Sequence, residues 1–456
     1  MDKSTETLAR YASELQYEKI PAEVLHDAKR KLIDTLGCAM GAYNAELCHA
    51  TRVLAQGTVG TPPARLLGSQ EYTTAQLAAF VNGTMVRALD FNDAYLSKAS
   101  CHPSDAVSGI VATADAVGAS GKALLTATVL SYEVSCNFAD VLLREQGIDN
   151  PFYCLVGGAL ASAKLMNLDF AKMANTVAFA VVPNLSLEET RAGELSMWKG
   201  CAGANAARNA VFAAEAARAG LTGPDQPIEG KWGLWHMIGV KFRWAPFGGQ
   251  GGDWRIAQTH LKAYPAVAHA QSPITAALKL YGTMKVEDIT SINIDSYWVA
   301  KRFDDRNSPL WRPTTSETAD HSIPYMVAAA LIDGDVTAAS FSAERLRDPK
   351  ILDLMQTMNV REDPAFSAAY PAEWPCRIEV TTKAGDVKTV ETRYFKGHNK
   401  SPMSDTEIEA KFRRLTSSLL SEPQITEILA KLWQLETVID IRDVLKLFAT
   451  KDAVKH

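Results

Sequence analysis

The chain has 456 residues, 47% hydrophobic and 22% charged, which is typical of a globular protein with more than one core. Its formal net charge of −5 gives no reason to expect binding to nucleic acid or to an anionic membrane. No apolar run approaches the ~18 residues of a membrane span and the N-terminus has no apolar signal core, so we expect a cytoplasmic protein.

Helical periodicity dominates roughly the first half of the chain. Apolar residues recur there at spacings of three and four, as in helices that pack on one face. The stretches are Leu8–Leu15, Val24–Leu36, Leu77–Val86, Lys122–Cys136, Gly157–Met166 and Phe170–Val181. A long helix rich in small residues is predicted from Glu194 to Ala219, where Gly220 ends it.

The pattern changes after about residue 266. Ser291–Ser296 alternates apolar and polar residues like a strand, and Arg377–Phe395 has two such runs around a turn, which predicts a hairpin. A helix is expected at Ile323–Leu331, and helices return from Ser404, which forms a capping box with Glu407. We therefore predict a mainly α protein, in which residues 1–265 and 399–456 form a helical domain and residues 266–398 an inserted α/β lid domain.

The seven cysteines include no Cys-x-x-Cys pair. Their odd number and their spacing argue against a zinc ribbon, an iron–sulfur cluster and a disulfide framework. We expect reduced thiols. His102 with two aspartates is a weak metal pattern without a sustained spacing, so we expect no metal.

Titratable residues are concentrated between Arg87 and Asp105, a stretch with apolar helical segments on both sides. Because charged groups are rarely buried unless paired, this stretch predicts an active-site loop. Pro103 disfavours helix at His102 and suits the first turn of a new helix. His102 is thereby placed at a loop-to-helix junction, where backbone amides favour an anionic ligand.

Two interpretations apply to the acid and base groups of this loop. His102 is a natural proton-transfer group that nearby carboxylates would orient, or else a structural histidine that caps the next helix. Asp90 and Asp93 are three residues apart, so one helical turn would put them on one face. They would orient a base or share a proton, or else end a helix as solvated acids.

Candidate binding residues lie further along the chain. Lys199 precedes a run of small residues, where a lone cation needs an anionic partner such as a substrate carboxylate; the alternative is a lysine at a solvated helix start. Lys262 lies just before Tyr264-Pro265 at an apparent junction. His321 and Tyr325 are one helical turn apart and could face a cleft, whereas Asp320 or Ser322 could simply cap that helix.

Several motifs in order resemble the MmgE/PrpD family, which includes 2-methylcitrate dehydratase and cis-aconitate decarboxylase. They are Leu89-Asp-Phe-Asn-Asp-Ala-Tyr95, His102-Pro-Ser-Asp105, Trp198-Lys199, Gly220-Leu-Thr-Gly-Pro224, Lys262-Ala-Tyr-Pro265, Thr318-Ala-Asp-His-Ser-Ile-Pro-Tyr325 and Asn399-Lys-Ser-Pro-Met-Ser-Asp405. The resemblance implies a helical domain and a smaller α/β lid with the site between them, usually in a homodimer. It also implies cofactor-free chemistry on small di- or tricarboxylic acids.

By motif match, the residues that line the site in relatives correspond to Asp90, His102, Lys199, Lys262 and Tyr325. We add Asn92, Asp93, Tyr95 and His321 as candidate substrate-binding residues because they lie in the same motifs. The sequence departs from the family in two places. Ala94 stands where the family often has Thr, and Gly147–Cys154 lacks the histidine that many relatives, decarboxylases included, carry there.

These inferences lead to one hypothesis with two alternatives. The hypothesis is a lyase that removes water from a hydroxy-tricarboxylic acid such as 2-methylcitrate. His102, assisted by Asp90, would move the proton, while Lys199 and Lys262 bind carboxylates and stabilise the developing charge. The first alternative is decarboxylation of cis-aconitate, or epimerisation of a related acid, in the same site. The second is a non-catalytic carboxylate-binding protein.

Overall fold

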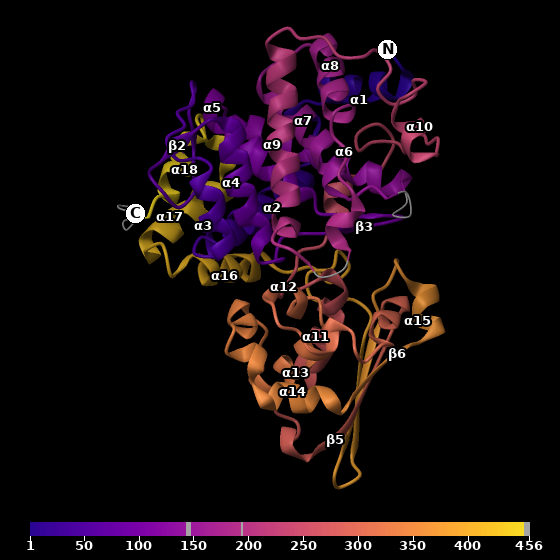
Figure 1. Ribbon diagram of the computed structural model, residues 1–456. Coiled ribbons are helices and arrows are strands. Elements are labelled where there is room, and N and C mark those ends of the chain that lie inside the picture. Colours follow the sequence, from indigo (N-terminus) through magenta and orange to yellow (C-terminus); the bar gives the residue numbers. More distant parts are fainter. Residues whose placement is uncertain (143–146, 193–194, 451–456) are drawn as a thin grey trace.

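The computed structural model describes residues 1–142, 147–192 and 195–450, which form two lobes joined end to end (Figure 1). The larger lobe is helical, and the smaller lobe combines helices with a four-stranded sheet. The prediction of a mainly α protein with a smaller sheet-containing part is therefore confirmed. Among the described residues, no helix is both long enough and apolar enough to cross a membrane.

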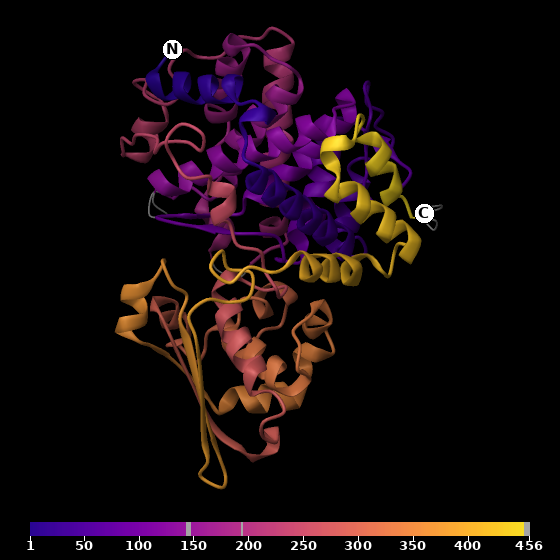
Figure 2. The same ribbon diagram turned by 180° about the vertical axis from the view of Figure 1, so that it is seen from behind.

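The helical lobe contains helices from both ends of the chain. They are α1 (Lys3–Glu14), α2 (Ala22–Gly41), α3 (Glu46–Val53), α4 (Ala75–Ala88), α5 (Val107–Val117), α6 (Gly121–Val141), α7 (Pro151–Leu165), α8 (Phe170–Val181), α9 (Trp198–Arg218), α10 (Leu234–Ile238), α16 (Asp405–Thr416), α17 (Glu422–Trp433) and α18 (Arg442–Leu445). Figure 2 shows the C-terminal helices against the N-terminal ones, and the largest hydrophobic core of this lobe runs from Leu8 to Phe448.

Small residues bring α4 and α9 unusually close together. A Cβ atom added to Gly83 of α4 would lie 2.9 Å from the Cα atom of Ala204 in α9. The tight contact lies near the C-terminal end of α4 and the N-terminal end of α9. At these ends Lys199, which begins α9 with Trp198, donates a hydrogen bond to Asp90, which follows α4. Helix packing of this kind fixes two parts of the candidate site relative to each other.

The smaller lobe contains one sheet and the helices that cover it. Its elements are α11 (Gln271–Leu280), β5 (Ile289–Ser296), α12 (Ser316–Ala319), α13 (Ile323–Asp333), α14 (Pro349–Gln356), β6 (Met358–Glu362), α15 (Pro364–Ala369), β7 (Cys376–Thr382) and β8 (Val387–Thr392). The strand order is β6-β5-β7-β8, with β5 and β6 parallel and the other pairs antiparallel. Helices α11, α13 and α14 lie on one side of the sheet (Figure 1).

The pairing of the strands explains how the smaller lobe forms a hydrophobic core of its own. Ile294 of β5 pairs with Val360 of β6 on one side and with Ile378 of β7 on the other, so buried apolar side chains line up across three strands. This core is separate from that of the helical lobe, and it extends from Ala266 to Phe395 apart from Ala94. The division into domains at residues 265/266 and 398/399 stays a prediction.

Several local predictions are confirmed. The capping box of Ser404 and Glu407 starts α16, the hairpin is formed by β7 and β8, and Ser322 caps α13. The long helix predicted from Glu194 begins at Trp198, while Glu194 itself lies outside the described residues.

The expected helical turn through Asp90 and Asp93 is wrong. Helix α4 ends at Ala88, and Asp90 has a φ of 46° in the left-handed region. The hairpin of β3 (Tyr95–Leu96) and β4 (Ser100–Cys101) then leads to the 3-10 turn η2 (Pro103–Ala106). Asp90 and Asp93 therefore lie in a loop and need not share a face.

Candidate active site

A cavity of about 520 Å³ is lined by residues of both lobes. Its lining combines the loop after α4 and the start of α9 with residues of the smaller lobe. Five basic side chains and two carboxylates are among the lining residues, namely Arg87, Arg191, Lys199, Lys262 and Arg302 with Asp90 and Glu188. This excess of positive charge suits a ligand that carries more than one carboxylate.

Asp90 is the centre of a buried ionic cluster. Its Oδ1 lies 2.6 Å from Nη1 of Arg87 and 2.5 Å from Nζ of Lys262, and its Oδ2 lies 2.8 Å from Nζ of Lys199. Burial alone would raise the pKa of Asp90, but the charges of these three cations outweigh it and hold the pKa well below its ordinary value. Asp90 is therefore a carboxylate that arranges cations, and it is not a proton donor near neutral pH.

The backbone around Asp90 is held in an unusual conformation. A positive φ at a residue other than glycine costs on the order of 1 kcal/mol and persists where the surroundings impose it. Here Nζ of Lys262 donates to the carbonyl oxygen of Asp90 at 2.7 Å as well as to its side chain. Burial lowers the pKa of Lys262 to about 8, although the Asp90 carboxylate acts in the opposite direction.

His102 lies on the cavity wall with one ring nitrogen already bonded. Its Nδ1 is 2.7 Å from the carbonyl oxygen of Asp93, which can only accept, so Nδ1 carries the proton. Burial and the charges of Arg87 and Lys262 lower the pKa of His102 well below its ordinary value. The neutral ring therefore keeps an unprotonated Nε2, as a general base requires.

The carboxylate of Asp93 holds the loop around His102 through hydrogen bonds inside the protein. Its Oδ1 accepts from the backbone N–H of Ser104 at 3.1 Å and from the Ser104 hydroxyl at 2.5 Å, and its Oδ2 accepts from Tyr132 at 2.7 Å. These bonds tie the loop to the turn that follows His102. Because the carboxylate is wholly occupied inside the protein, Asp93 holds the loop in place and does not line the cavity.

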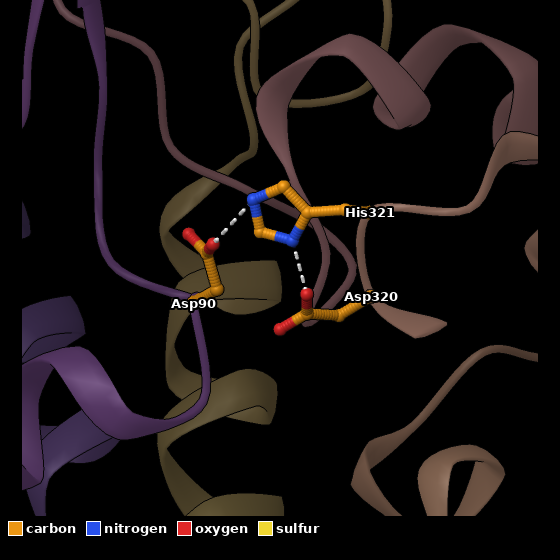
Figure 3. Close-up of side chains that lie close together, drawn as sticks. All are labelled: Asp90, Asp320 and His321. Carbon is orange, nitrogen blue, oxygen red and sulfur yellow. Dashed lines mark hydrogen bonds and ion pairs between the residues drawn. The ribbon is translucent and has the colours of Figure 1, made fainter. Parts of the chain in front are cut away.

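The smaller lobe contributes His321, which lies between two carboxylates (Figure 3). Its Nδ1 bonds to Asp320, and its Nε2 lies 3.7 Å from Oδ2 of Asp90, too far for a hydrogen bond. Burial and the nearby Lys199 lower the pKa of His321. A neutral His321 with its proton on Nδ1 leaves Nε2 able to accept a hydrogen bond from a ligand.

Among the described residues, Asp90, Asp320 and His321 form the one group that could hold a metal ion, with ligand atoms within 4.8 Å of one another. Both oxygens of Asp90 already face cations, namely Arg87 and Lys262 on one side and Lys199 on the other. A divalent cation would meet these three positive charges at close range, so the donor set fits a metal poorly.

Comparison with family models matches residues 6–246 to the MmgE/PrpD N-terminal domain and residues 264–435 to the MmgE/PrpD C-terminal domain. The chain belongs to the MmgE/PrpD family. The C-terminal match includes the smaller lobe and continues into α16 and α17 of the helical lobe.

Similar proteins of this family have two different named activities. The chain is 32% identical to 2-methylcitrate dehydratase of Cupriavidus necator over 417 residues, which is 84% of each protein. It is 32% identical to 2-methylcitrate dehydratase of Escherichia coli (strain K12) over 378 residues, 78% of this chain and 77% of the relative. Cis-aconitate decarboxylase of Mus musculus is 24% identical over 467 residues, 96% of this chain and 91% of the relative.

In this MmgE/PrpD protein, five of the residues singled out in the sequence line the common cavity, namely Asp90, His102, Lys199, Lys262 and His321. They come from four separate parts of the chain. Besides Asp93, three others do not line the cavity, because protein groups occupy their polar atoms. Asn92 bonds to Ser104 and Asp105, Tyr95 to Asp140 at 2.8 Å, and Tyr325 to the carbonyl of Ser340 at 2.7 Å. The structure gives these three side chains local, stabilising contacts.

Two arginines on the cavity wall were missed by sequence reasoning. Arg191 is held by the buried Asp149, with Nε to Oδ1 at 2.6 Å, and by Asn150, with Nη2 to Oδ1 at 3.3 Å. Arg302 lies on the 3-10 turn η8 (Trp298–Phe303) of the smaller lobe. No local motif marks either residue, because both have acidic neighbours in the chain, Glu188 and Glu189 before Arg191 and Asp304 and Asp305 after Arg302, as ordinary surface arginines often do.

Proposed function

We propose that the protein is a hydro-lyase that removes water from a small hydroxy-tricarboxylic acid, for which 2-methylcitrate is the leading candidate. One observation carries the proposal. A neutral His102 shares a cavity with Lys199 and Lys262, and the buried carboxylate of Asp90 fixes both ammonium groups. This combination supplies a base for a C–H proton and cations for the negative charge that develops when the proton leaves.

In the proposed step His102 is the base and Lys262 is the acid. Nε2 of His102 removes the proton next to a substrate carboxylate, the C–O bond to the hydroxyl breaks, and a C=C bond forms. Lys262 donates two of its three N–H groups to Asp90, and its third protonates the departing hydroxide, for which a pKa of about 8 is well suited. The products are one unsaturated acid and one water molecule.

The proposed carboxylate partners are Lys199 and Arg191. Lys199 bonds to Asp90 through one N–H, so among the described residues two N–H groups remain for a ligand. Arg191 is oriented by Asp149 and Asn150 and presents the rest of its fork to the cavity. Two anchors of this kind favour a substrate with well-separated carboxylates.

We further propose that the enzyme is a cytoplasmic homodimer. The seven free, buried cysteines suit a reducing compartment. The exposed side chains of Val182, Leu185 and Phe212 lie around the hydrogen bond between Asn184 and Asn209 on the α8–α9 face, and a second copy could cover this apolar patch. Light scattering should give twice the mass of the chain, and Phe212→Glu should shift it towards the monomer. A monomeric wild-type protein would contradict this assignment.

Product analysis tests the proposed activity. The protein is incubated separately with 2-methylcitrate, citrate and cis-aconitate, and the products are followed by NMR. We expect loss of water from the hydroxy acid and no loss of carbon dioxide from cis-aconitate. Loss of carbon dioxide from cis-aconitate would instead favour the decarboxylase activity for which the relative from Mus musculus is named. Binding without turnover of any acid would leave a carboxylate-binding protein.

A further inference from the structure

We infer that Lys411, a residue of the C-terminal helix α16, is a positioning residue that holds Lys262 and the turn at Asp90 in place relative to each other. The expected effect of Lys411 on turnover rests on the proposed function, whereas its expected effect on Lys262 rests on the geometry alone. Lys411 does not line the cavity, and only 4% of its surface is exposed. A buried ammonium group at this depth requires full pairing.

Three oxygen atoms of the protein surround the ammonium group of Lys411. Its Nζ lies 2.6 Å from Oδ1 of Asp34 in α2, and it donates to the carbonyl oxygens of Phe91 and Lys262, both at 2.9 Å. The same ammonium lies 3.6 Å from the centroid of the Phe91 ring. Since these groups enclose the ammonium and Lys411 does not line the cavity, it can act on the substrate only through the residues that it holds.

Those residues flank the centre of the ionic cluster. Phe91 follows Asp90 directly, so two consecutive carbonyls of the left-handed turn are each bonded to a lysine, that of Asp90 to Lys262 and that of Phe91 to Lys411. Lys411 also fixes the backbone of Lys262 itself. One side chain thus connects the carboxylate-bearing turn with the ammonium that pairs with it.

The location of Lys262 gives this connection its importance. Lys262 lies in the segment that enters the smaller lobe, where the N–H of Leu261 bonds to the carbonyl of Gly397 on the returning segment at 2.9 Å. Motion of the smaller lobe would therefore displace Lys262 relative to Asp90 unless its backbone is anchored to the helical lobe. Lys411 provides that anchor through α16 and Asp34 of α2.

The test is the double variant Lys411→Met/Asp34→Asn, which removes the ammonium and its charged partner together so that no buried charge is left unpaired. The matched control is Lys29→Met/Glu436→Gln. Lys29 has the same kind of pairing, with Glu436 at 2.6 Å and the carbonyl of Trp433 at 2.9 Å, but neither residue lines the cavity.

Two readouts separate positioning from stability alone. The first is the titration of Lys262 followed by NMR of lysine side chains, with its signal assigned by its loss in Lys262→Met. In the Lys411 variant we expect the titration of Lys262 to move by about one pH unit or more towards that of an ordinary lysine, because a loosened side chain regains solvent. The second is turnover, for which we expect kcat to fall about 10- to 100-fold with KM little changed.

The control variant should leave both readouts at wild-type values. A folded Lys411 variant with an unmoved Lys262 titration would overturn the inference, whatever its activity. If the wild-type protein has no turnover on polycarboxylates, the proposed function fails while the titration still decides the role of Lys411. If the double variant does not fold, Lys411→Gln/Asp34→Asn keeps a polar amide in the site and is measured in the same way.

Discussion

Lys262 donates to Asp90 twice, to the side-chain oxygen Oδ1 at 2.5 Å and to the backbone carbonyl at 2.7 Å. The contact spans 172 positions of the chain and joins the segment leading into the smaller lobe to the loop after α4. It fixes where an ammonium with a lowered pKa lies relative to the cavity. The acid–base behaviour of the protein should follow from this pair and from His102.

The pH dependence of kcat/KM should be limited on the alkaline side by Lys262. Burial lowers the pKa of Lys262 to about 8, and above this pH the ammonium loses both its charge and the proton that it would donate. His102, whose pKa burial lowers well below the ordinary 6.5, stays an unprotonated base to more acid pH. Rates measured from about pH 5 to about pH 10 should therefore hold to near neutrality and then decline around pH 8.

Lys164→Met is the control for this profile. Burial also lowers the pKa of Lys164, but its Nζ donates to the carbonyl of Ala12 and it does not line the cavity. The variant should keep the alkaline decline of the wild type. A wild-type profile that stays flat well above pH 8 would count against Lys262 as the acid.

Asp105→Asn should stabilise the protein at neutral pH more than at acid pH. Burial raises the pKa of Asp105 from 3.8 to about 6, and its Oδ2 has no hydrogen-bond partner among the described residues. Between these values the folded state binds the proton more strongly than the unfolded state, so the free energy of unfolding falls as pH rises through this window. The isosteric amide removes that cost, a gain of about 1 to 2 kcal/mol above pH 6.

Denaturant unfolding of both proteins at pH 7.5 and pH 4 measures the effect, each at fixed salt concentration. The difference between variant and wild type should shrink at the lower pH, where Asp105 is protonated in the folded state. An equal difference at both values would show that the charge of Asp105 has no part in it.

Arg191→Lys should weaken the use of tricarboxylates in particular. The lysine keeps a positive charge beside the buried Asp149 but loses the planar fork that Asp149 and Asn150 now orient. We expect kcat/KM for the tricarboxylate to fall about 10-fold or more, with little change for an analogue that lacks one carboxylate. Steady-state kinetics with both substrates make the comparison.

Arg218→Lys, at the exposed end of α9, serves as the control for this substitution. It should behave as the wild type with both substrates. An equal loss on the two substrates in Arg191→Lys would mean that Arg191 stabilises the fold near the cavity and does not select the third carboxylate.

Metal removal should leave turnover unchanged. The carboxylate of Asp90, the central oxygen donor of the possible ligand group, is already neutralised by Arg87, Lys199 and Lys262. We therefore expect the same rate before and after dialysis against a chelator, and no activation by Mg²⁺ or Mn²⁺. If dialysis abolishes activity and one of these ions restores it, the group of Asp90, Asp320 and His321 binds a metal ion that the reaction needs.

Much of the fold could be predicted because its signals are local. The capping box at Ser404 and the turn between β7 and β8 depend on a few neighbouring residues, and both are present as expected. His102 was likewise marked by the Pro103 that follows it, and it precedes a 3-10 turn that leads into α5. In such cases the residues that determine the structure are adjacent in the chain.

The interior of the site could be predicted only in part, because its partners are distant in sequence. Asp90 and Asp93 look equivalent in the loop, yet two distant lysines and a tyrosine from α6 give them different roles. The spacing of three suggested a helical turn, but the contacts of Lys262 and Lys411 impose a left-handed residue instead. Arg191 and Lys411 were missed for the same reason, since their partners are brought together only by the fold.

The measurement that tests the account most directly is the conversion of 2-methylcitrate by the wild-type protein and by His102→Asn, followed by proton NMR. The asparagine keeps a polar group near the Asp93 carbonyl but has no basic nitrogen, so both proteins should fold and bind the acid. The account predicts an unsaturated tricarboxylic acid from the wild type and a rate lower by at least about 100-fold in the variant. Comparable conversion by the two proteins, or none by the wild type, would contradict it.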